Sequence, residues 1–168
     1  GPLLLSEWGL FSDMATQTPA ADVVPYAINA PLFSDYAVKR RYLRLPPGGT
    51  ITIDETGHWL FPDGSVIVKT FGFLVDERDP SLGERTIETR LLSREDGEWR
   101  SYVYVWNDAE TDAELDLGGR RVPVDFVDAS GASVSITYRI PTEVQCGNCH
   151  GGTGPTELIG VRTEQMDH

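Results

Sequence analysis

The chain has 168 residues, a length that suits a single domain with a sizeable core. Its formal net charge of −12 argues against nucleic acid as a partner, because this surface would repel the phosphates. No apolar run reaches the roughly 18 residues that a membrane-spanning helix requires, so no membrane span is expected.

The first 35 residues combine an apolar stretch with a proline-rich one. Apolar side chains recur at a loosely helical spacing over residues 3–16, which predicts a short helix. Prolines then interrupt residues 18–35 and predict an ordered segment that wraps the domain without regular structure.

From residue 50 to residue 138 the sequence predicts one strand after another. The predicted strands are rich in β-branched and aromatic residues and are separated by turn residues such as Asp96-Gly97. They comprise residues 51–53, 65–73, 85–94, 99–106, 113–117, 122–127 and 134–140. Short strands without intervening helical patterns favour a mainly β fold, an antiparallel β-sandwich or barrel, with short helices at the N-terminus and in the C-terminal segment.

The C-terminal segment, residues 141–168, carries the chemistry. Both cysteines of the chain lie in the string Cys146-Gly147-Asn148-Cys149-His150. The spacing C-x-x-C-H is typical of covalent attachment of haem c, since two thiols on one turn can reach the two vinyl groups at one porphyrin edge. The histidine that follows can then reach the iron. We therefore predict one haem c on Cys146 and Cys149, with His150 as the proximal iron ligand.

A structural zinc site and a thiol redox pair are alternative interpretations of the same string. Zinc needs a second ligand pair, for which His58 and His168 lie at unsuitable spacings. A thioredoxin-like pair would lie beside a βαβ pattern, and the sequence shows none.

The second axial ligand is open to several side chains. Electron-transfer haems usually have a methionine or a second histidine opposite the first. Met166 follows the motif by 16 residues, so a single loop could place it on the distal face of the ring. Its place could be taken by His58, and then by Met14 or His168, or the position could be open.

Two charged stretches invite functional interpretations. Lys39, Arg40, Arg41 and Arg44 could hold a haem propionate, although a solvated basic face is the simpler interpretation. Acidic residues alternate over residues 108–116 and predict a solvated edge that could attract a basic partner. Calcium binding by this stretch is the alternative, but the glycine of an EF-hand loop is missing.

Several strings resemble a bacterial family of predicted periplasmic c-type cytochromes, often di-haem, without an assigned role. They are Trp8-Gly9-Leu10-Phe11, Val24-Pro25-Tyr26, Pro31-Leu32-Phe33-Ser34-Asp35-Tyr36-Ala37 followed by Lys39, Phe61-Pro62-Asp63-Gly64, Val68-Lys69-Thr70-Phe71, Arg78-Asp79-Pro80, Ile87-Glu88-Thr89-Arg90-Leu91, Tyr104-Val105-Trp106-Asn107 and Thr111-Asp112-Ala113-Glu114. The strings span most of the chain in order, and the family's C-x-x-C-H falls on Cys146, Cys149 and His150.

The resemblance implies a periplasmic or secreted bacterial haem protein, and the chain corresponds to the mono-haem N-terminal domain of the longer family members. The sequence also begins with Gly1-Pro2, typical of the remnant of a cleaved tag. We therefore expect a single domain over residues 1–168, excised from a longer protein, with a mostly β scaffold over residues 1–140.

These observations together predict an electron-transfer protein and not an enzyme. Its partner would be another redox protein, such as a second cytochrome module or a secreted sugar- or polysaccharide-oxidising enzyme, the latter by analogy only. The alternatives are a haem enzyme or sensor with an open distal site, peroxidase-like, and a binding module in which haem or zinc is structural.

Overall fold

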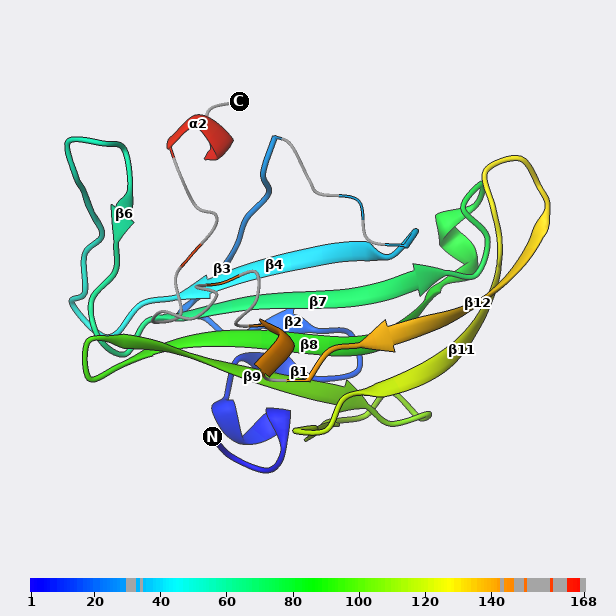
Figure 1. Ribbon diagram of the computed structural model, residues 1–168, viewed down its shortest axis with the longest axis horizontal. Coiled ribbons are helices and arrows are strands. Elements are labelled where there is room, and N and C mark those ends of the chain that lie inside the picture. Colours follow the sequence, from blue (N-terminus) through cyan, green and yellow to red (C-terminus); the bar gives the residue numbers. More distant parts are fainter. Residues whose placement is uncertain are drawn as a thin grey trace.

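The computed structural model describes residues 1–29, 33, 35–142, 144–146, 150, 158 and 163–166. Figure 1 shows a fold built mainly of β-strands. The elements are, in chain order, η1 (Leu5–Trp8), β1 (Phe11–Asp13), β2 (Thr18–Pro19), β3 (Val23–Pro25), β4 (Val38–Arg44), β5 (Thr52–Ile53), β6 (Trp59–Leu60), β7 (Val66–Leu74), η2 (Pro80–Leu82), β8 (Glu84–Glu95), β9 (Glu98–Trp106), β10 (Ala113–Leu115), β11 (Arg120–Val127), β12 (Ser133–Ile140) and α2 (Thr163–Met166), where η denotes a 3-10 helix.

A six-stranded antiparallel sheet forms the centre of the fold (Figure 1), with strand order β10-β9-β8-β7-β4-β3. The long predicted strands 65–73, 85–94 and 99–106 correspond to β7, β8 and β9 and lie next to one another. The expectation of a mainly β, antiparallel fold is therefore confirmed.

The predicted turn at Asp96-Gly97 joins β8 to β9. Both residues have positive φ, 52° and 79°, and Glu95 pairs directly with Glu98. Two consecutive left-handed residues define the type I′ turn, whose twist matches that of the flanking strands. The turn thus sets the register in which β8 and β9 pair.

One face of the sheet is covered by the N-terminal residues, where the predicted helix is wrong beyond its first turn. Only η1 is helical, and Gly9 ends it with φ of 61°. The chain then forms β1, which pairs with β2, and Phe11 packs edge-on against Tyr42 with ring centroids 5.2 Å apart. Packing on the sheet therefore outweighed the weak helical spacing. The core on this face comprises Leu5, Leu10, Phe11, Val23, Tyr42, Val66, Val68, Leu91, Tyr104, Trp106 and Ala113.

Strand β4 was not predicted, because its sequence is dominated by charged residues. Side chains alternate between the two faces of a strand, so neighbouring cations in β4 separate. Tyr42 enters the core of the N-terminal face, and Arg40 on that side bonds Glu84 at 2.9 Å. Lys39 and Arg41 therefore lie on the opposite face. Their aliphatic stems can cover the sheet while the charged ends reach polar groups.

The opposite face is covered at one end by the β11–β12 hairpin, which makes the fold sandwich-like. Two main-chain hydrogen bonds of Val127 join the hairpin to the residues that follow β7. The Val127 carbonyl accepts from Glu77 N at 2.9 Å, and Val127 N donates to Val75 O at 3.1 Å. We call the core beneath the hairpin the hairpin cluster. It comprises Ala37, Phe71, Phe73, Ile87, Val103, Val105, Val124, Phe126, Tyr138, Ile140 and Cys146.

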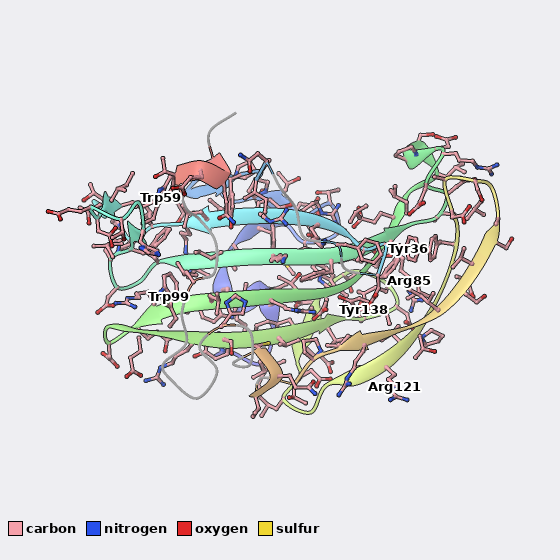
Figure 2. All side chains as sticks on the ribbon, turned by 45° about the horizontal axis from the view of Figure 1, so that its top comes forward. Tyr36, Trp59, Arg85, Trp99, Arg121 and Tyr138 are labelled. Atoms are coloured by element: carbon pink, nitrogen blue, oxygen red, sulfur yellow. The ribbon has the colours of Figure 1, made fainter. Side chains whose placement is uncertain are left out.

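The other end of the same face carries a second apolar group, which we call the aromatic cluster. Its buried members are Phe61, Ile67 and Trp99, and Tyr26, Leu43, Leu92, Trp59 and Met166 are among the half-buried residues that pack against them. Figure 2 places Trp59 and Trp99 at one end of the sheet and Tyr36 and Tyr138 toward the other. The two clusters therefore lie at opposite ends of one face.

Gly119 matters for the position of the C-terminal segment. Its φ is +66°, and a Cβ there would lie 2.9 Å from both Ile140 O and Thr142 N. We expect Gly119→Ala to lower the free energy of unfolding by about 2–3 kcal/mol, because a strained left-handed residue is added to a main-chain clash. Urea denaturation followed by tryptophan fluorescence measures this.

Gly97 is the matched control for Gly119. Its φ is also positive, at +79°, but no heavy atom lies within 4 Å of the Cβ position. Gly97→Ala should therefore cost only the left-handed conformation, about 1 kcal/mol. Equal losses in the two variants would show that the backbone around Ile140 yields without cost.

Candidate functional site

The segment that carries the cysteines begins with a capped helical turn. Strand β12 ends at Ile140, and residues 144–146 are helical. The Thr142 hydroxyl accepts a hydrogen bond from Gln145 N at 3.2 Å, and the Gln145 side-chain oxygen accepts one from Thr142 N at 3.1 Å. This reciprocal pair is a capping box, which the pattern Thr-x-x-Gln favours. The start of a short helix in the C-terminal segment, as predicted, is therefore confirmed.

Cys146 points its side chain toward the sheet. It is 9% exposed and belongs to the hairpin cluster. Other members of that cluster come from the central sheet, such as Val103, and from the hairpin, such as Ile140. The first predicted attachment residue thus lies at the boundary between the two layers of the sandwich.

His150 lies one helical turn after Cys146. Its main-chain N–H donates to the carbonyl oxygen of Cys146 at 3.0 Å, and the residue is half-buried. Cys149 lies outside the described residues. The structure therefore brings two of the three predicted attachment residues together and describes nothing of the third.

Met166 packs against the aromatic cluster on the same face as Cys146. It ends α2, which is tied down by hydrogen bonds from the Asn29 side chain to Glu164 O at 2.6 Å and from Trp59 Nε1 to Thr163 Oγ1 at 3.2 Å. Met166 is therefore held over the sheet at the end opposite the hairpin cluster.

The other predicted axial ligands are placed differently. Met14 packs against the core of the N-terminal face, so the central sheet separates it from Cys146. His58 lies in the turn between β5 and β6, where its Nδ1 is 2.6 Å from Thr56 Oγ1 and 3.7 Å from Asp54 Oδ2. These contacts account for one of its two ring nitrogens. His168 lies outside the described residues.

A row of cations crosses the sheet between the two apolar clusters. Arg41 of β4 pairs with Lys69 of β7, which pairs with Arg90 of β8. On β7, Lys69 is flanked two residues away by Ile67 of the aromatic cluster and by Phe71 of the hairpin cluster. We call Arg41, Lys69 and Arg90 the basic row. Arg40 donates to the Thr86 hydroxyl and Arg44 to Trp8 O, both on the N-terminal face of the sheet. Of the four basic residues at 39–44, only Lys39 and Arg41 therefore share the face of the basic row.

Arg90 is held by a buried carboxylate. Its guanidinium donates to both oxygens of Glu88, at 2.9 and 2.5 Å, and Glu88 has no exposed surface. The Tyr138 hydroxyl donates to Glu88 Oε1 at 2.7 Å and thereby ties β12 to the sheet. Burial acts to lower the pKa of Arg90, but the hydrogen bonds and charge of Glu88 outweigh it and raise that pKa. A smaller contribution comes from Cys146, which places the thiol close to this ion pair.

The rest of the basic row has no such anion in the described part of the chain. Among the described residues Arg41 and Lys69 make no salt bridge with a carboxylate. Burial, reinforced by the charges of Arg41, Arg90 and Lys39, lowers the pKa of Lys69 to about 8. Burial likewise lowers the pKa of Arg41, and the nearby Tyr26 only partly offsets this. The sequence did not predict a functional role for Lys69, Glu88 or Arg90. The only signal was their alternation with apolar residues in β7 and β8, which could have placed them on one face.

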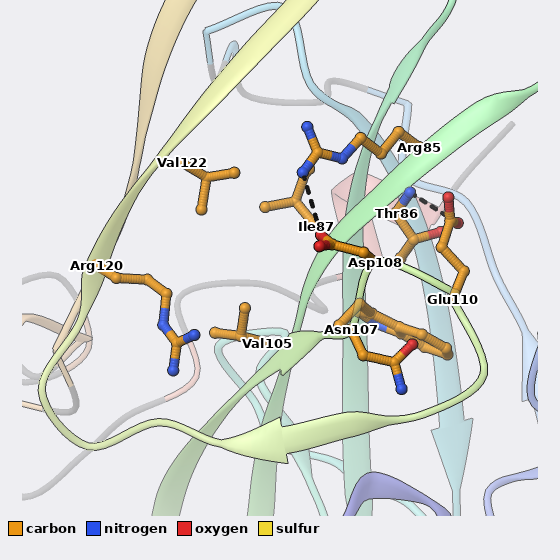
Figure 3. A pocket seen from close by; sticks show the side chains of 10 residues that line it. Arg85, Thr86, Ile87, Val105, Asn107, Asp108, Glu110, Arg120 and Val122 are labelled. Carbon is orange, nitrogen blue, oxygen red and sulfur yellow. Dashed lines mark hydrogen bonds and ion pairs between the residues drawn. The ribbon is translucent and has the colours of Figure 1, made fainter.

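A small polar cavity lies between β8 and β9 of the sheet, the loop that follows β9, and β11 of the hairpin (Figure 3). Its volume is about 120 Å³, and Arg85, Asp108, Glu110 and Arg120 are among its lining residues. Arg85 is anchored by Pro123 O at 3.1 Å, and Glu110 accepts from Thr86 N at 3.0 Å. Drug-sized ligands need about 300–1,000 Å³, so this cavity cannot enclose a porphyrin. It contains none of the predicted attachment residues.

The acidic stretch 108–116 is less solvated than predicted. Asp116 is buried and bonds Gly119 N and Arg120, and Asp112 accepts from the Ser6 hydroxyl at 2.6 Å. These carboxylates therefore connect the residues that flank β10 to η1 and to the start of β11. Among the described residues, no group of three or more His, Cys, Asp or Glu side chains could hold a metal ion, and this applies to calcium as well as zinc.

None of the described helices is long and apolar enough to cross a membrane. Comparison of the chain with protein-family models, with curated proteins and with solved structures finds no match in any of the three.

Proposed function

We propose that this chain is a c-type cytochrome domain that carries one haem on Cys146 and Cys149, with His150 as the proximal iron ligand, and transfers electrons. The string Cys146-Gly147-Asn148-Cys149-His150 carries the proposal, because its spacing serves two thioether bonds and one axial ligand. The capped turn that starts this string supports it, since the turn fixes the direction in which the first thiol enters the fold.

The described residues fit such a group in their donor chemistry. One face of the sheet carries a thiol at Cys146, a thioether at Met166, aromatic side chains for the apolar ring, and cations for its carboxylates. When bound, haem c supplies a one-electron Fe(III)/Fe(II) couple.

The residues of the chain have separate roles in this proposal. Cys146 and Cys149 would hold the haem through two thioethers, each formed by addition of an S–H across a vinyl group, which needs no oxidant. His150 would coordinate the iron. One electron is accepted from a reduced donor protein and given to an oxidised acceptor protein, without exchange of a covalent bond.

The proposed location is the periplasm or the exterior of a bacterial cell, where covalent attachment keeps the cofactor from being lost. The partner would be a second cytochrome module or a secreted sugar- or polysaccharide-oxidising enzyme. The net charge of −12 favours a partner with a basic docking surface.

A spectroscopic redox titration tests electron transfer. The protein is produced in a bacterial periplasm together with haem-maturation machinery, and its spectrum is recorded at a series of applied potentials. We expect a reversible one-electron transition between two low-spin, six-coordinate forms. A high-spin ferric form that binds cyanide readily would contradict this proposal and favour an open distal site.

Replacing Met166 tests the second axial ligand. We expect Met166→Ala to lower the reduction potential and to leave a high-spin or histidine-ligated ferric spectrum, because a thioether ligand favours the ferrous state. Met14→Ala is the matched control, since Met14 lies on the other face of the sheet, and its spectrum should match wild type. An unchanged Met166→Ala spectrum would remove Met166 from the iron, and His58→Ala would be tested next.

A further inference from the structure

The basic row places three cations side by side on neighbouring strands, where like charges repel one another. Arg41 lies directly opposite Lys69, and Lys69 directly opposite Arg90. Directly opposite side chains in neighbouring strands have Cβ atoms about 4.5–5.5 Å apart, and like charges there are destabilising. The row is also half-buried, so water compensates only part of this repulsion.

The carboxylate nearest the row, Glu88, already bonds Arg90 and Tyr138. The charges that act on Lys69 among the described residues are those of Arg41, Arg90, Lys39 and the single anion Glu88. Glu88 makes bidentate contact with Arg90 and accepts from Tyr138, so its oxygens are engaged away from Arg41. Arg41 and Lys69 therefore lack a paired anion within the described part of the chain.

The surroundings of the row favour an amphipathic ligand over a free ion. The hairpin cluster and the aromatic cluster flank it on the same face. Phe71 adds a ring that lies 4.3 Å from the Arg90 guanidinium carbon and 5.0 Å from Lys69 Nζ, so the apolar and cationic surfaces are continuous. Cys146, a buried member of the hairpin cluster, belongs to the same face.

We infer that Arg41 and Lys69, the two members of the basic row that no described carboxylate bonds, take the propionate groups of the haem attached at Cys146. The inference rests on the proposed function. A haem combines a flat apolar body with two carboxylates, and this face offers apolar clusters beside cations without a described anion. Arg41 supplies a fork for bidentate contact, whereas Lys69 supplies a point charge. Both are positioning residues and not iron ligands.

Amine acylation tests the row without any measurement of activity. Lys39 and Lys69 are the two lysines of the sequence, so peptide mass spectrometry can follow each of them, with the Gly1 amine as an internal reference. Acetylation near pH 7.5 is compared between haem-loaded protein and unloaded protein whose circular dichroism shows the same β-sheet signal. We expect Lys69 to react at least about tenfold more slowly in the loaded protein, because a paired carboxylate keeps the amine protonated.

A soluble anion is the other source of a carboxylate. Unloaded protein in acetate or succinate buffer should keep its fast Lys69 reaction if the row takes propionates. Protection by the free carboxylate alone, without further protection on haem loading, would overturn the inference.

Charge variants of the loaded protein provide the second readout. We expect Lys69→Met to lower the Fe(II):Fe(III) ratio at a fixed applied potential about threefold or more, since a cation near the ring stabilises the added electron. Lys69→Arg should restore the wild-type ratio. The control is Arg121, an exposed residue of β11 (Figure 2). Arg121→Gln also removes one positive charge, but outside the basic row, and should leave the ratio unchanged.

The two proposals fail in different ways. Loaded protein in which Lys69→Met matches wild type, with unaltered Lys69 acetylation, would overturn the carboxylate row and leave the cytochrome proposal intact. Protein that never acquires haem would overturn the cytochrome proposal itself.

Discussion

Haem staining of the protein on denaturing gels is expected to disappear when Cys146 and Cys149 are both replaced by alanine. Thioether bonds survive denaturation, whereas coordination to His150 does not, so staining reports on the covalent bonds alone. The gel, run on wild type and variant matured in the same cells, measures this directly.

The structure indicates that this loss should not reflect unfolding. Cys146 is one of eleven buried members of the hairpin cluster, and the other ten come from the sheet, the hairpin and the segment before β4. Far-ultraviolet circular dichroism of the double variant should therefore keep the wild-type β-sheet signal. His150→Ala is the control, since it keeps both thioethers and should still stain while its spectrum becomes high-spin. Staining that persists in the double cysteine variant would exclude attachment at this motif.

Arg90→Met is expected to lower the free energy of unfolding by about 3–5 kcal/mol, the usual cost of leaving one partner of a buried ion pair alone. Glu88 has no exposed surface and, among the described residues, would keep only the Tyr138 hydroxyl as a hydrogen-bond partner. The loss should appear as a lower urea midpoint at neutral pH with an unchanged slope.

Two further variants separate the buried charge from the packing around it. Tyr138→Phe removes one hydrogen bond to Glu88 and should cost about 1–3 kcal/mol. Glu88→Gln combined with Arg90→Met removes both charges and should be less destabilised than Arg90→Met alone. An Arg90→Met variant no less stable than Tyr138→Phe would show that Glu88 is compensated in another way.

The central part of the fold was predictable because its strands have clear local signals. β7, β8 and β9 are long and rich in β-branched and aromatic residues, and a turn with two left-handed residues joins the last two. Strand β4, between β7 and β3, was not predictable in the same way. In β4 the aliphatic stems of Lys and Arg side chains cover the sheet. A hydrophobicity pattern counts these residues as polar, so it does not indicate a strand.

The candidate site divides along the same line. Cys146, Cys149 and His150 are adjacent in sequence, so their chemistry can be identified without a structure. Lys69 and Arg90 are 21 residues apart and become neighbours only through the register of β7 with β8. Single charged residues in strands do not indicate which partners they meet, and the four basic residues at 39–44 prove to be divided between the two faces of the sheet.

The mass of the intact, denatured protein after maturation in a haem-attaching periplasm tests the central claim most directly. We predict a single species heavier than the polypeptide by one haem, with the added mass located on the peptide that contains Cys146 and Cys149. A colourless protein with the mass of the bare polypeptide, purified from cells that mature a control cytochrome in parallel, would contradict it.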